Sequence, residues 1–331
     1  MASPDPFEHS FVGLIAARAV TAAVTLGVFE ALVAGPIDAE QLADRLGLQP
    51  DGAEALLTAL VTLGYLRVED GRYAAESVVE RLLVKSSPDS IASFAGAQSD
   101  LHWDVLRPLD AAIRSGEPYR LHEDRQDDPA WEGYMRGLFE ISRGEQDSNA
   151  ALVPVDDPRS LVDVAGGHGG FSMAMCRRHE GLRATIVDLP AAAAVGRRIV
   201  AEQGFADRIE FRDGDVFDPH GGGLGEGHDV VAVFNLVHHL PEERDRELVR
   251  MARAALRPGG VLVVGDSEKP VPGSPSEHGA LSSLLFYAWS GSRNFEGREI
   301  VAWLEAAGFV GVEVHRNEAS PWRIVVIGSA P

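Results

Sequence analysis

The chain is poor in cysteine and in positive charge, and each shortage narrows its possible functions. Among 331 residues Cys176 is the only cysteine, so neither an internal disulfide nor a cluster of thiolate metal ligands can form. Such low cysteine use is typical of a reducing compartment, and we expect a cytoplasmic protein. Thirty Lys and Arg residues face 50 Asp and Glu residues, which gives a formal charge of −20 at pH 7. Because a strongly acidic chain is repelled by phosphate backbones and by anionic lipid, we expect neither nucleic acid nor a membrane surface as a partner.

One apolar stretch near the N-terminus, residues 11–33, is long enough to raise the question of a membrane span. Arg18 and Glu30 interrupt it, and both charges would be costly inside lipid. Asp5 and Glu8 precede it, where a secretory signal would carry Lys or Arg. We therefore expect one or two buried helices, packed either at a subunit interface or in the core of a single chain.

The overall composition is that of a folded protein with material for about two domains. Apolar residues make up 45% of the chain and charged residues 24%, which excludes a largely disordered chain. From changes in residue pattern along the chain we predict three parts. Residues 1–90 form a helical domain, residues 91–154 a helical linker that lines the substrate pocket, and residues 155–331 an α/β domain.

Residues 36–75 carry the pattern of two helices followed by a two-stranded hairpin. Gly47 separates the helices, and an Asp-Gly pair at 70–71 forms a turn between two short strands. This order is that of a winged helix, a fold that often binds DNA. Over residues 36–85, however, five basic residues face nine acidic ones, and the second helix (51–63) has no Lys or Arg. Because phosphate binding needs basic side chains, we predict a role in packing or homodimer formation, with DNA binding as the weaker alternative.

Large side chains gather in residues 91–154. Trp131, Met135 and Phe139 lie four residues apart and would share one helical face. Such a stripe either packs in the core or lines an apolar pocket, and both interpretations remain open. We take Trp103, Trp131 and Met135 as candidate substrate-binding residues.

From residue 160 onward, short apolar strands alternate with helices. The strands are expected at 161–164, 184–187, 209–211, 230–234 and 261–264. Such alternation predicts a parallel sheet covered by helices on both faces, that is, a Rossmann-like domain. The fold class is therefore α/β, with a helical N-terminal domain in front of the sheet.

The most informative segment is the glycine-rich turn after the first of these strands, Ala165-Gly-Gly-His-Gly-Gly170. Glycines there let the backbone approach a ligand, and the following helix presents free N–H groups. Asp188 closes the next strand, where a carboxylate accepts hydrogen bonds from ribose hydroxyls. The combination indicates a cofactor that contains adenosine.

Two acidic residues favour S-adenosylmethionine over a nicotinamide dinucleotide. Asp163 precedes the glycines, where it would repel a pyrophosphate but attract a cationic ammonium or sulfonium group. Asp215 follows a third strand, in position to accept from an exocyclic amine. The turn also departs from the dinucleotide fingerprint G-x-G-x-x-G. We therefore predict S-adenosylmethionine as cofactor, S-adenosylhomocysteine as its product, and no metal site.

With these motifs in place, the sequence resembles the class I S-adenosylmethionine-dependent O-methyltransferases, in particular the caffeate and acetylserotonin O-methyltransferase-like group of bacterial natural-product pathways. The resemblance covers nearly the whole chain and implies a Rossmann-like methyltransferase domain behind a winged-helix dimerisation domain. Its motifs are Asp-Val-Ala-Gly-Gly-His-Gly at 163–169, Asp-Leu-Pro at 188–190, Gly-Asp-Val-Phe at 214–217, Leu-Arg-Pro-Gly-Gly at 256–260 and Ala-Ala-Gly-Phe at 306–309. The cofactor-binding residues that it implies are Asp163, Gly166, Gly167, Asp188, Leu189, Asp215, Val216 and Asn235.

The resemblance also implies a general base. In the family a His after the fourth strand takes the proton from the acceptor hydroxyl, and the matching residue here is His238. His239 stands where the family pattern has Asp, and Asp266 stands where it has an acid that orients the His. A neutral imidazole can accept a proton near pH 7. Two alternatives remain open: neither His takes part in chemistry, or the pair binds a metal together with Asp266 or His278.

One departure from the family concerns a second acid. The position expected to carry Glu falls at Arg293 or Asn294. A basic group there would pair with an anionic acceptor such as an aromatic carboxylate, so Arg293 is a candidate substrate-binding residue.

Together these features predict an S-adenosylmethionine-dependent O-methyltransferase that acts on a hydroxyl, in the first place a phenolic one, of a small aromatic or polyketide intermediate. Within the same fold, the alternatives are a C- or N-methyltransferase, with or without a metal, and a relative that binds the cofactor without transferring its methyl group. A DNA-binding regulator is the alternative outside enzymes.

Overall fold

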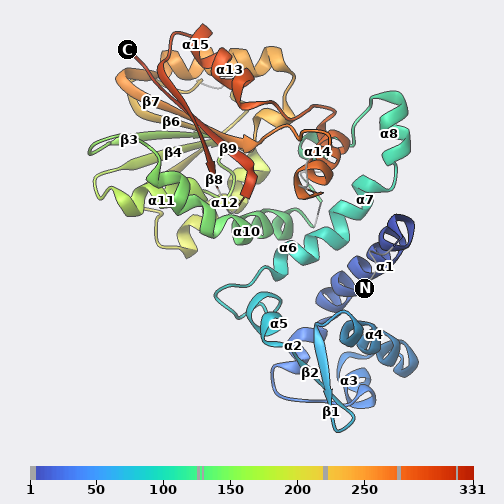
Figure 1. The fold of residues 1–331 in the computed structure, drawn as a ribbon. Coiled ribbons are helices and arrows are strands. Elements are labelled where there is room, and N and C mark those ends of the chain that lie inside the picture. Colours follow the sequence, from blue (N-terminus) through green and yellow to red (C-terminus); the bar gives the residue numbers. More distant parts are fainter. Residues whose placement is uncertain (1–4, 125–126, 129, 219–222, 274–276, 318–319) are drawn as a thin grey trace. The chain divides into compact units, whose positions relative to one another are not determined.

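The chain folds into two compact units, here seen in a computed structural model (Figure 1). The structure describes residues 5–124, 127–128, 130–218, 223–273, 277–317 and 320–331. Unit 1 is made of residues up to 104 together with 130–141, and unit 2 is made of 105–129 together with 142–331. The long helix α10 (Trp131–Ala151) therefore contributes its first half to unit 1 and its second half to unit 2.

Unit 1 contains the predicted pair of helices and the hairpin. Asp38 caps the first of these helices by accepting a hydrogen bond from the Gln41 amide (2.8 Å), and Gly47 ends it in the left-handed conformation. Asp70 and Gly71 both have positive φ, as a two-residue hairpin turn requires. In chain order the elements are α1 (Pro6–Leu26), α2 (Val28–Leu32), α3 (Ala39–Leu46), α4 (Pro50–Thr62), β1 (Leu66–Glu69), β2 (Arg72–Ala75) and α5 (Ser77–Leu82).

The two helices expected within residues 11–33 are present, but they differ in burial. Helix α2 is buried almost throughout, whereas α1 buries only residues near its C-terminal end. By length and composition α1 would be long enough to cross a membrane, a test that core helices and signal sequences also pass. The side chains on its N-terminal half that are more than half exposed are Phe7, Phe11, Val12, Leu14 and Ile15.

The remaining part of unit 1 joins α6 (Ala92–Ala97) to the first half of α10. Glu140 accepts hydrogen bonds from the amides of Ser93 (2.9 Å) and Phe94 (3.2 Å) at the start of α6. A Cβ atom at Gly137 would lie 2.5 Å from the Cα atom of Phe94, so only glycine permits this approach of the two helices. A π-helix, η1 (Gln98–His102), and the short helix α7 (Trp103–Leu106) follow α6.

Unit 2 is built on a seven-stranded sheet with the order β5-β4-β3-β6-β7-β9-β8. All strands run parallel except β9, which pairs antiparallel with both of its neighbours. The five predicted parallel strands are confirmed, and β8 and β9 are additional strands that were not predicted. The strands are β3 (Ser160–Val164), β4 (Arg183–Asp188), β5 (Ile209–Asp213), β6 (His228–Phe234), β7 (Leu256–Ser267), β8 (Val310–Asn317) and β9 (Ser320–Ser329).

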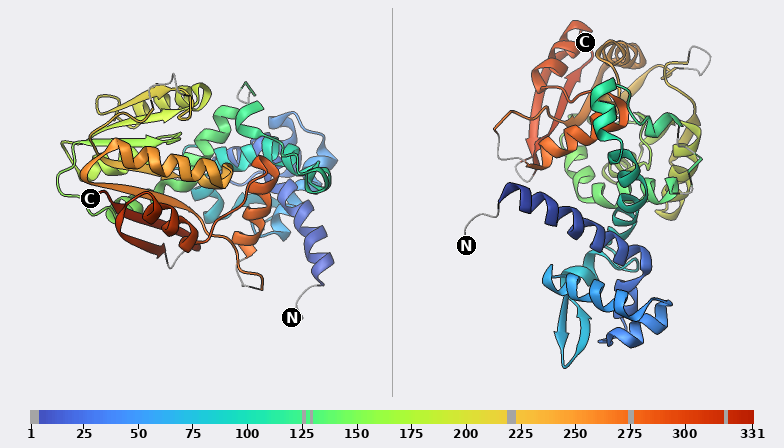
Figure 2. Two further views of the ribbon diagram at one scale, coloured as in Figure 1. Left: turned by 90° about the horizontal axis from the view of Figure 1, so that it is seen from above. Right: turned by 90° about the vertical axis from the view of Figure 1, so that its right-hand side faces the viewer.

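Helices cover both faces of this sheet, as expected for buried parallel strands. Helices α13 and α15 lie side by side on one face, and α11 and α12 lie on the other (Figures 1 and 2). Val162, Val231 and Leu262 of neighbouring strands form the core under α13 and α15. The helices of unit 2 outside α10 are α8 (Leu109–Ser115), α9 (Leu121–Asp124), α11 (Gly170–Arg178), α12 (Pro190–Glu202), η2 (Val237–His239), α13 (Glu242–Ala255), α14 (Glu277–Ser290) and α15 (Gly297–Ala306).

Candidate active site

The carboxyl ends of the parallel strands bring most of the predicted site residues to one edge of the sheet. The glycine turn follows β3, Asp188 ends β4, Asn235 follows β6, and Asp266 lies near the end of β7. Strand order reverses between β3 and β6, and ligands of open α/β sheets bind at such a point. The cofactor and acceptor residues predicted in unit 2 therefore belong to a single edge.

Asp163 lies beneath the glycine turn. Its carboxylate is 1% exposed, and Oδ2 accepts a hydrogen bond from the Ser172 hydroxyl (2.7 Å). A Cβ atom at Gly166 would come within 2.5 Å of the Asp163 carboxyl carbon, so this position requires glycine. Burial raises the pKa of Asp163 to about 7, and Oδ1 has no hydrogen-bond partner among the described residues. The group is thus a buried acceptor with capacity for one further donor.

The glycine turn also contains an uncommon backbone conformation. Ala165 has a φ of 53°, in the left-handed region that disfavours residues with a Cβ atom. Gly167, with a φ of 51°, donates its amide to Asp188 Oδ2 at 2.7 Å. This bond ties the turn to the end of β4 and fixes its path across the sheet edge.

Asp188 is held by the backbone on both of its oxygens. Oδ1 accepts from the Leu189 amide (2.7 Å) and Oδ2 from the Gly167 amide. Burial raises the pKa of Asp188 to about 6, while both amide bonds lower it. Two carboxylate oxygens offer about four lone pairs, so the side chain can still accept from hydroxyls of a ligand.

The last two strand ends of the predicted cofactor site are more open. Asp215 is exposed, and its Oδ1 accepts from the Phe217 amide (2.9 Å); Val216 lies between them and is half-buried. Asn235 has a φ of 54°, and its amide donates to the Gly265 carbonyl (2.9 Å). The left-handed conformation at Asn235 turns the chain out of β6 toward η2.

His238 and Asp266 form a buried pair, 28 residues apart in sequence. Nδ1 of His238 lies 2.6 Å from Oδ1 of Asp266, and both side chains are almost fully buried. Asp266 also accepts from the amides of Ser267 (2.6 Å) and His238 (3.4 Å). Because a carboxylate accepts hydrogen bonds, Nδ1 carries the proton in the neutral imidazole, and Nε2 keeps a lone pair. The phenyl ring of Phe286 stacks on this imidazole with a centroid distance of 3.9 Å.

His239 lies beside His238 in η2, but it has a different environment. Its ring centroid is 4.1 Å from that of His238 and 4.6 Å from that of His122. Burial and these two imidazoles hold the pKa of His239 well below its usual range, and burial lowers the pKa of His122 to about 4. Both rings are therefore neutral near pH 7.

His122 was not predicted as a site residue, because no motif surrounds it. It reaches the site through two backbone hydrogen bonds, from the Tyr119 amide to the Ala288 carbonyl and from the Arg120 amide to the Trp289 carbonyl, both 2.8 Å. These bonds hold the segment before α9 against the end of α14. No spacing rule connects positions 122 and 239, so only the tertiary fold identifies this contact.

Of the two residues at the expected second acid, Asn294 and not Arg293 lies behind the His–Asp pair. Asn294 is buried and donates from Nδ2 to the Ser267 carbonyl (2.8 Å). Arg293 forms ion pairs with Glu299 (2.8 Å) and Glu242 (3.2 Å). Because two carboxylates already neutralise the guanidinium, this placement does not favour the predicted pairing of Arg293 with an anionic acceptor.

The other predicted substrate-binding residues belong to unit 1. Trp131 and Met135 are buried, and the Trp131 ring contacts that of Tyr134 with a centroid distance of 5.4 Å. Trp103 is half-buried at the start of α7. Their role toward a substrate stays a prediction.

The alternative of a metal held by the paired histidines has no matching cluster in the described part of the chain. No group of three or more His, Cys, Asp or Glu side chains there is placed to hold a metal ion. His278, considered as a further ligand, is exposed and packs against the Trp322 ring with a centroid distance of 4.6 Å.

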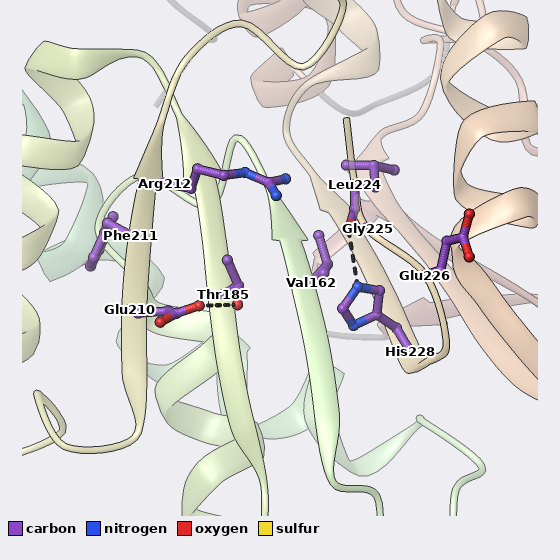
Figure 3. A pocket seen from close by; sticks show the side chains of 9 residues that line it. All are labelled: Val162, Thr185, Glu210, Phe211, Arg212, Leu224, Gly225, Glu226 and His228. Atoms are coloured by element: carbon purple, nitrogen blue, oxygen red, sulfur yellow. Dashed lines mark hydrogen bonds between the residues drawn. The ribbon is translucent and has the colours of Figure 1, made fainter. Parts of the chain in front are cut away.

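A cavity of about 470 Å³ lies elsewhere, over the strands β3 to β6 rather than at their carboxyl ends (Figure 3). Figure 3 shows Thr185 hydrogen-bonded to Glu210, and His228 bonded to the Leu224 carbonyl. None of the predicted site residues lines it. The lining residues are Val162, Thr185, Glu210, Phe211, Arg212, Leu224, Gly225, Glu226 and His228.

Two protein-family models match the chain in the order of its parts. An O-methyltransferase dimerisation domain matches residues 8–85, and an O-methyltransferase domain matches residues 115–310. The second model alone covers more than half of the sequence.

Individual relatives match along nearly their whole length. The 3-hydroxy-5-methyl-1-naphthoate 3-O-methyltransferase of Streptomyces sahachiroi is 32% identical over 315 residues, which is 93% of this chain and 90% of the relative. The L-tyrosine C(3)-methyltransferase of Streptomyces lavendulae is 28% identical over 335 residues, which is 94% of this chain and 88% of the relative. Among solved structures, PigF with SAH superposes with a TM-score of 0.87 at 23% identity and covers 99% of both chains, a likeness of fold.

Proposed function

Because the chain belongs to the O-methyltransferase family and is an S-adenosylmethionine-dependent methyltransferase, we propose that its acceptor is a phenolic hydroxyl of a small aromatic or polyketide intermediate. The observation that carries this proposal is the buried His238–Asp266 pair at the strand edge that also holds the glycine turn. A phenol has a pKa near 10 and is mostly protonated at pH 7, so its methylation benefits from a base.

The residues at the strand edge fit S-adenosylmethionine, which supplies an electrophilic methyl group when bound. Asp163 Oδ1 is a buried acceptor without a partner in the described part of the chain, and a ligand ammonium would satisfy it. Asp188 retains lone pairs for ribose hydroxyls, and Asp215 is exposed at the end of the neighbouring strand. Gly166, Gly167, Leu189, Val216 and Asn235 complete the proposed cofactor site at the same edge.

In the proposed mechanism His238 is the general base. Asp266 holds the proton on Nδ1, so that Nε2 accepts the proton of the acceptor hydroxyl while the oxygen attacks the methyl carbon. The imidazolium that results is stabilised by the carboxylate that it already contacts. A positioned base contributes about 10²–10⁴-fold, and alignment of the two reactants contributes up to about 7–11 kcal/mol.

The test is methyl transfer from labelled S-adenosylmethionine to a panel of phenols, with His238→Ala against the unchanged chain. We expect turnover to fall about 10²–10⁴-fold while cofactor affinity by calorimetry stays the same. His315→Ala, at a His far along the chain that pairs with Glu313, is the matched control. Unchanged turnover in His238→Ala would contradict the role given to this residue.

We propose further that residues 1–90, a winged-helix-like domain, form a homodimer interface. The dimerisation-domain match at 8–85 and the exposed apolar side chains of α1 support this, because such a surface is unfavourable in water. Residues 91–154 would then supply substrate contacts, including Trp103, Trp131 and Met135, and residues 155–331 the cofactor site.

Light scattering of the purified chain tests the dimer. Phe11→Asp combined with Ile15→Asp, two exposed positions on α1, is expected to give the monomer mass. Val68→Asp, an exposed apolar residue of the hairpin, is expected to leave the dimer mass unchanged. A wild-type monomer would contradict the proposal. We also propose a cytoplasmic location without nucleic-acid or membrane partners, which cell fractionation checks.

Carbon or nitrogen methylation on the same fold is a second candidate, since a relative with 28% identity is named a C-methyltransferase. Mass spectrometry and NMR of the product distinguish a methyl ether from a new C–CH₃ or N–CH₃ bond. Turnover that a chelator abolishes would favour metal-assisted carbon methylation. Cofactor binding without any methyl transfer would favour a non-methylating relative.

A further inference from the structure

The two adjacent histidines of η2 differ in what their ring nitrogens contact. His238 is paired with Asp266 at 2.6 Å, as described above. His239 has a buried Nδ1 that finds no hydrogen-bond partner anywhere in the described part of the chain. Its backbone is satisfied, because its amide donates to the Leu236 carbonyl (2.9 Å). The unmet demand therefore belongs to the imidazole alone.

An unpaired buried nitrogen is unusual. Roughly 90% or more of buried backbone polar groups, and most buried side-chain ones, have a partner, so an exception calls for an explanation. The neighbours of His239 do not provide the bond: the rings of His122, Trp289 and Phe286 contact it edge-on or stacked. Asp266, the nearest acid in the pair, is already used by His238 and the Ser267 amide. The missing partner is therefore best supplied by a bound molecule.

The position of this nitrogen relates it to the acceptor. The ring centroids of His238 and His239 are only 4.1 Å apart. A group that hydrogen-bonds His239 while a hydroxyl reaches His238 must therefore lie close to that hydroxyl on the same acceptor. Both imidazoles are neutral near pH 7, and a neutral imidazole pairs with hydroxyl or carbonyl oxygens through one donor and one acceptor nitrogen.

We propose that His239 is a specificity-determining residue that recognises a second oxygen beside the methylated hydroxyl, so that the enzyme prefers aromatic acceptors with neighbouring oxygens. The second oxygen is a hydroxyl or carbonyl at the ortho or peri position. This inference rests on the proposed function and adds the class of acceptor to it. It also explains a His where the family pattern has Asp: a neutral donor and acceptor replaces a charge.

The test compares isomeric acceptors that differ only in where the second oxygen lies. Substrates 2,3-dihydroxynaphthalene and 1,8-dihydroxynaphthalene have neighbouring oxygens, whereas the 2,7 and 1,5 isomers have remote ones. In the full-length dimer we expect kcat/KM to favour the neighbouring isomers by about tenfold or more, because a polar site rejects analogues that leave it unpaired. The ratio between isomers within each variant cancels differences in intrinsic reactivity when variants are compared.

His239→Phe keeps a ring of similar shape but removes both nitrogens. We expect kcat/KM for the neighbouring isomers to fall about 10- to 100-fold, the effect of one lost buried hydrogen bond, with little change for the remote isomers. His239→Asn, whose amide lies near the place of Nδ1, is expected to restore part of the preference. Thermal unfolding and cofactor affinity, measured for both variants, show whether the site remains folded.

Three results would overturn the inference. They are a wild-type enzyme without preference between the isomers, an equal loss on both classes in His239→Phe, and no change in either class. Failure to methylate any phenol while the cofactor binds would instead overturn the proposed function, and the inference would fall with it. Methylation of remote and neighbouring isomers alike leaves the proposed function intact and contradicts only the inference.

Discussion

The two sides of the strand edge handle buried carboxylates in different ways. On the side of β3, Asp163 has one hydrogen bond to Ser172, and one oxygen is unpaired among the described residues. On the side of β7, Asp266 is engaged by His238 and by the Ser267 amide. The first carboxylate is left with capacity for a ligand, while the second is spent on orienting a side chain. The comparison teaches that one edge can bind at one end and position at the other with the same chemical group.

The largest expected effect comes from Asp266→Asn, which breaks the positioning side. The amide can present N–H to Nδ1 and thereby move the imidazole proton to Nε2, where the base must have a lone pair. We expect kcat to fall about 10²–10⁴-fold with cofactor affinity unchanged. Steady-state kinetics and calorimetry on the same preparation check this. A loss confined to cofactor affinity would mean that Asp266 belongs to the binding side.

Asp245 sharpens the comparison, because this carboxyl is fully buried and has no hydrogen bond among the described residues. Burial, and then the charges of Asp266 and Glu242, raise its pKa to about 9. The folded state therefore holds a proton that the unfolded chain releases near pH 4, so stability is greatest below that pH and decreases as pH rises toward 9. The decrease is at most about 1.4 kcal/mol per pH unit.

Asp245→Asn removes this titration while keeping the shape of the side chain. Urea unfolding at pH 5, 6, 7 and 8 should show a variant that gains stability relative to the wild type as pH rises. Parallel pH dependence of the two proteins would show that Asp245 is not the titrating group.

Asp163→Asn breaks the binding side. Removing the negative charge leaves a weaker partner for a cationic ligand, and we expect the Kd of S-adenosylmethionine to rise about 10- to 100-fold. At saturating cofactor kcat should change little. Asp213→Asn, an exposed carboxylate at the end of β5 that pairs with Arg197, is the control and should not alter the Kd. An equal loss in both variants would point to a general effect of charge.

The smallest expected effect is a gain at Ala165. Its φ of 53° is unfavourable for alanine, and glycine adopts this conformation without steric cost. We expect Ala165→Gly to stabilise the protein by about 0.5–1 kcal/mol, measured as a rise in Tm. Ala111→Gly, at an exposed position inside α8, should destabilise by up to about 1 kcal/mol. A lower Tm for Ala165→Gly would show that the backbone strain at this turn is small.

The binding side of the edge was predictable from sequence, because each of its residues belongs to a local motif. The glycine turn, Asp188 and Asp215 each follow a strand that an apolar run indicates, and the structure brings them to one edge. The pairing of His238 with Asp266 came only from the family resemblance, since 28 residues separate them. His122 could not be found, because its contact with His239 depends on backbone bonds between the 119–120 segment and α14.

The same distinction applies to the fold. Five parallel strands were predicted from short apolar runs between helices, whereas β8 and β9 were missed. The run of apolar residues at 324–327 in β9 was the available signal. Arg293 was assigned to the acceptor because of its charge, but its ion pairs with Glu242 and Glu299 depend on helices whose packing the sequence does not reveal.

The central claim is that His238 takes the proton of the acceptor hydroxyl, and a crystal structure with S-adenosylhomocysteine and a methylatable phenol tests it most directly. The account predicts the phenolic oxygen within about 2.6–3.2 Å of His238 Nε2, with Asp266 still bonded to Nδ1. A phenolic oxygen held beyond hydrogen-bond reach of either histidine, in a complex whose crystals are active, would contradict it.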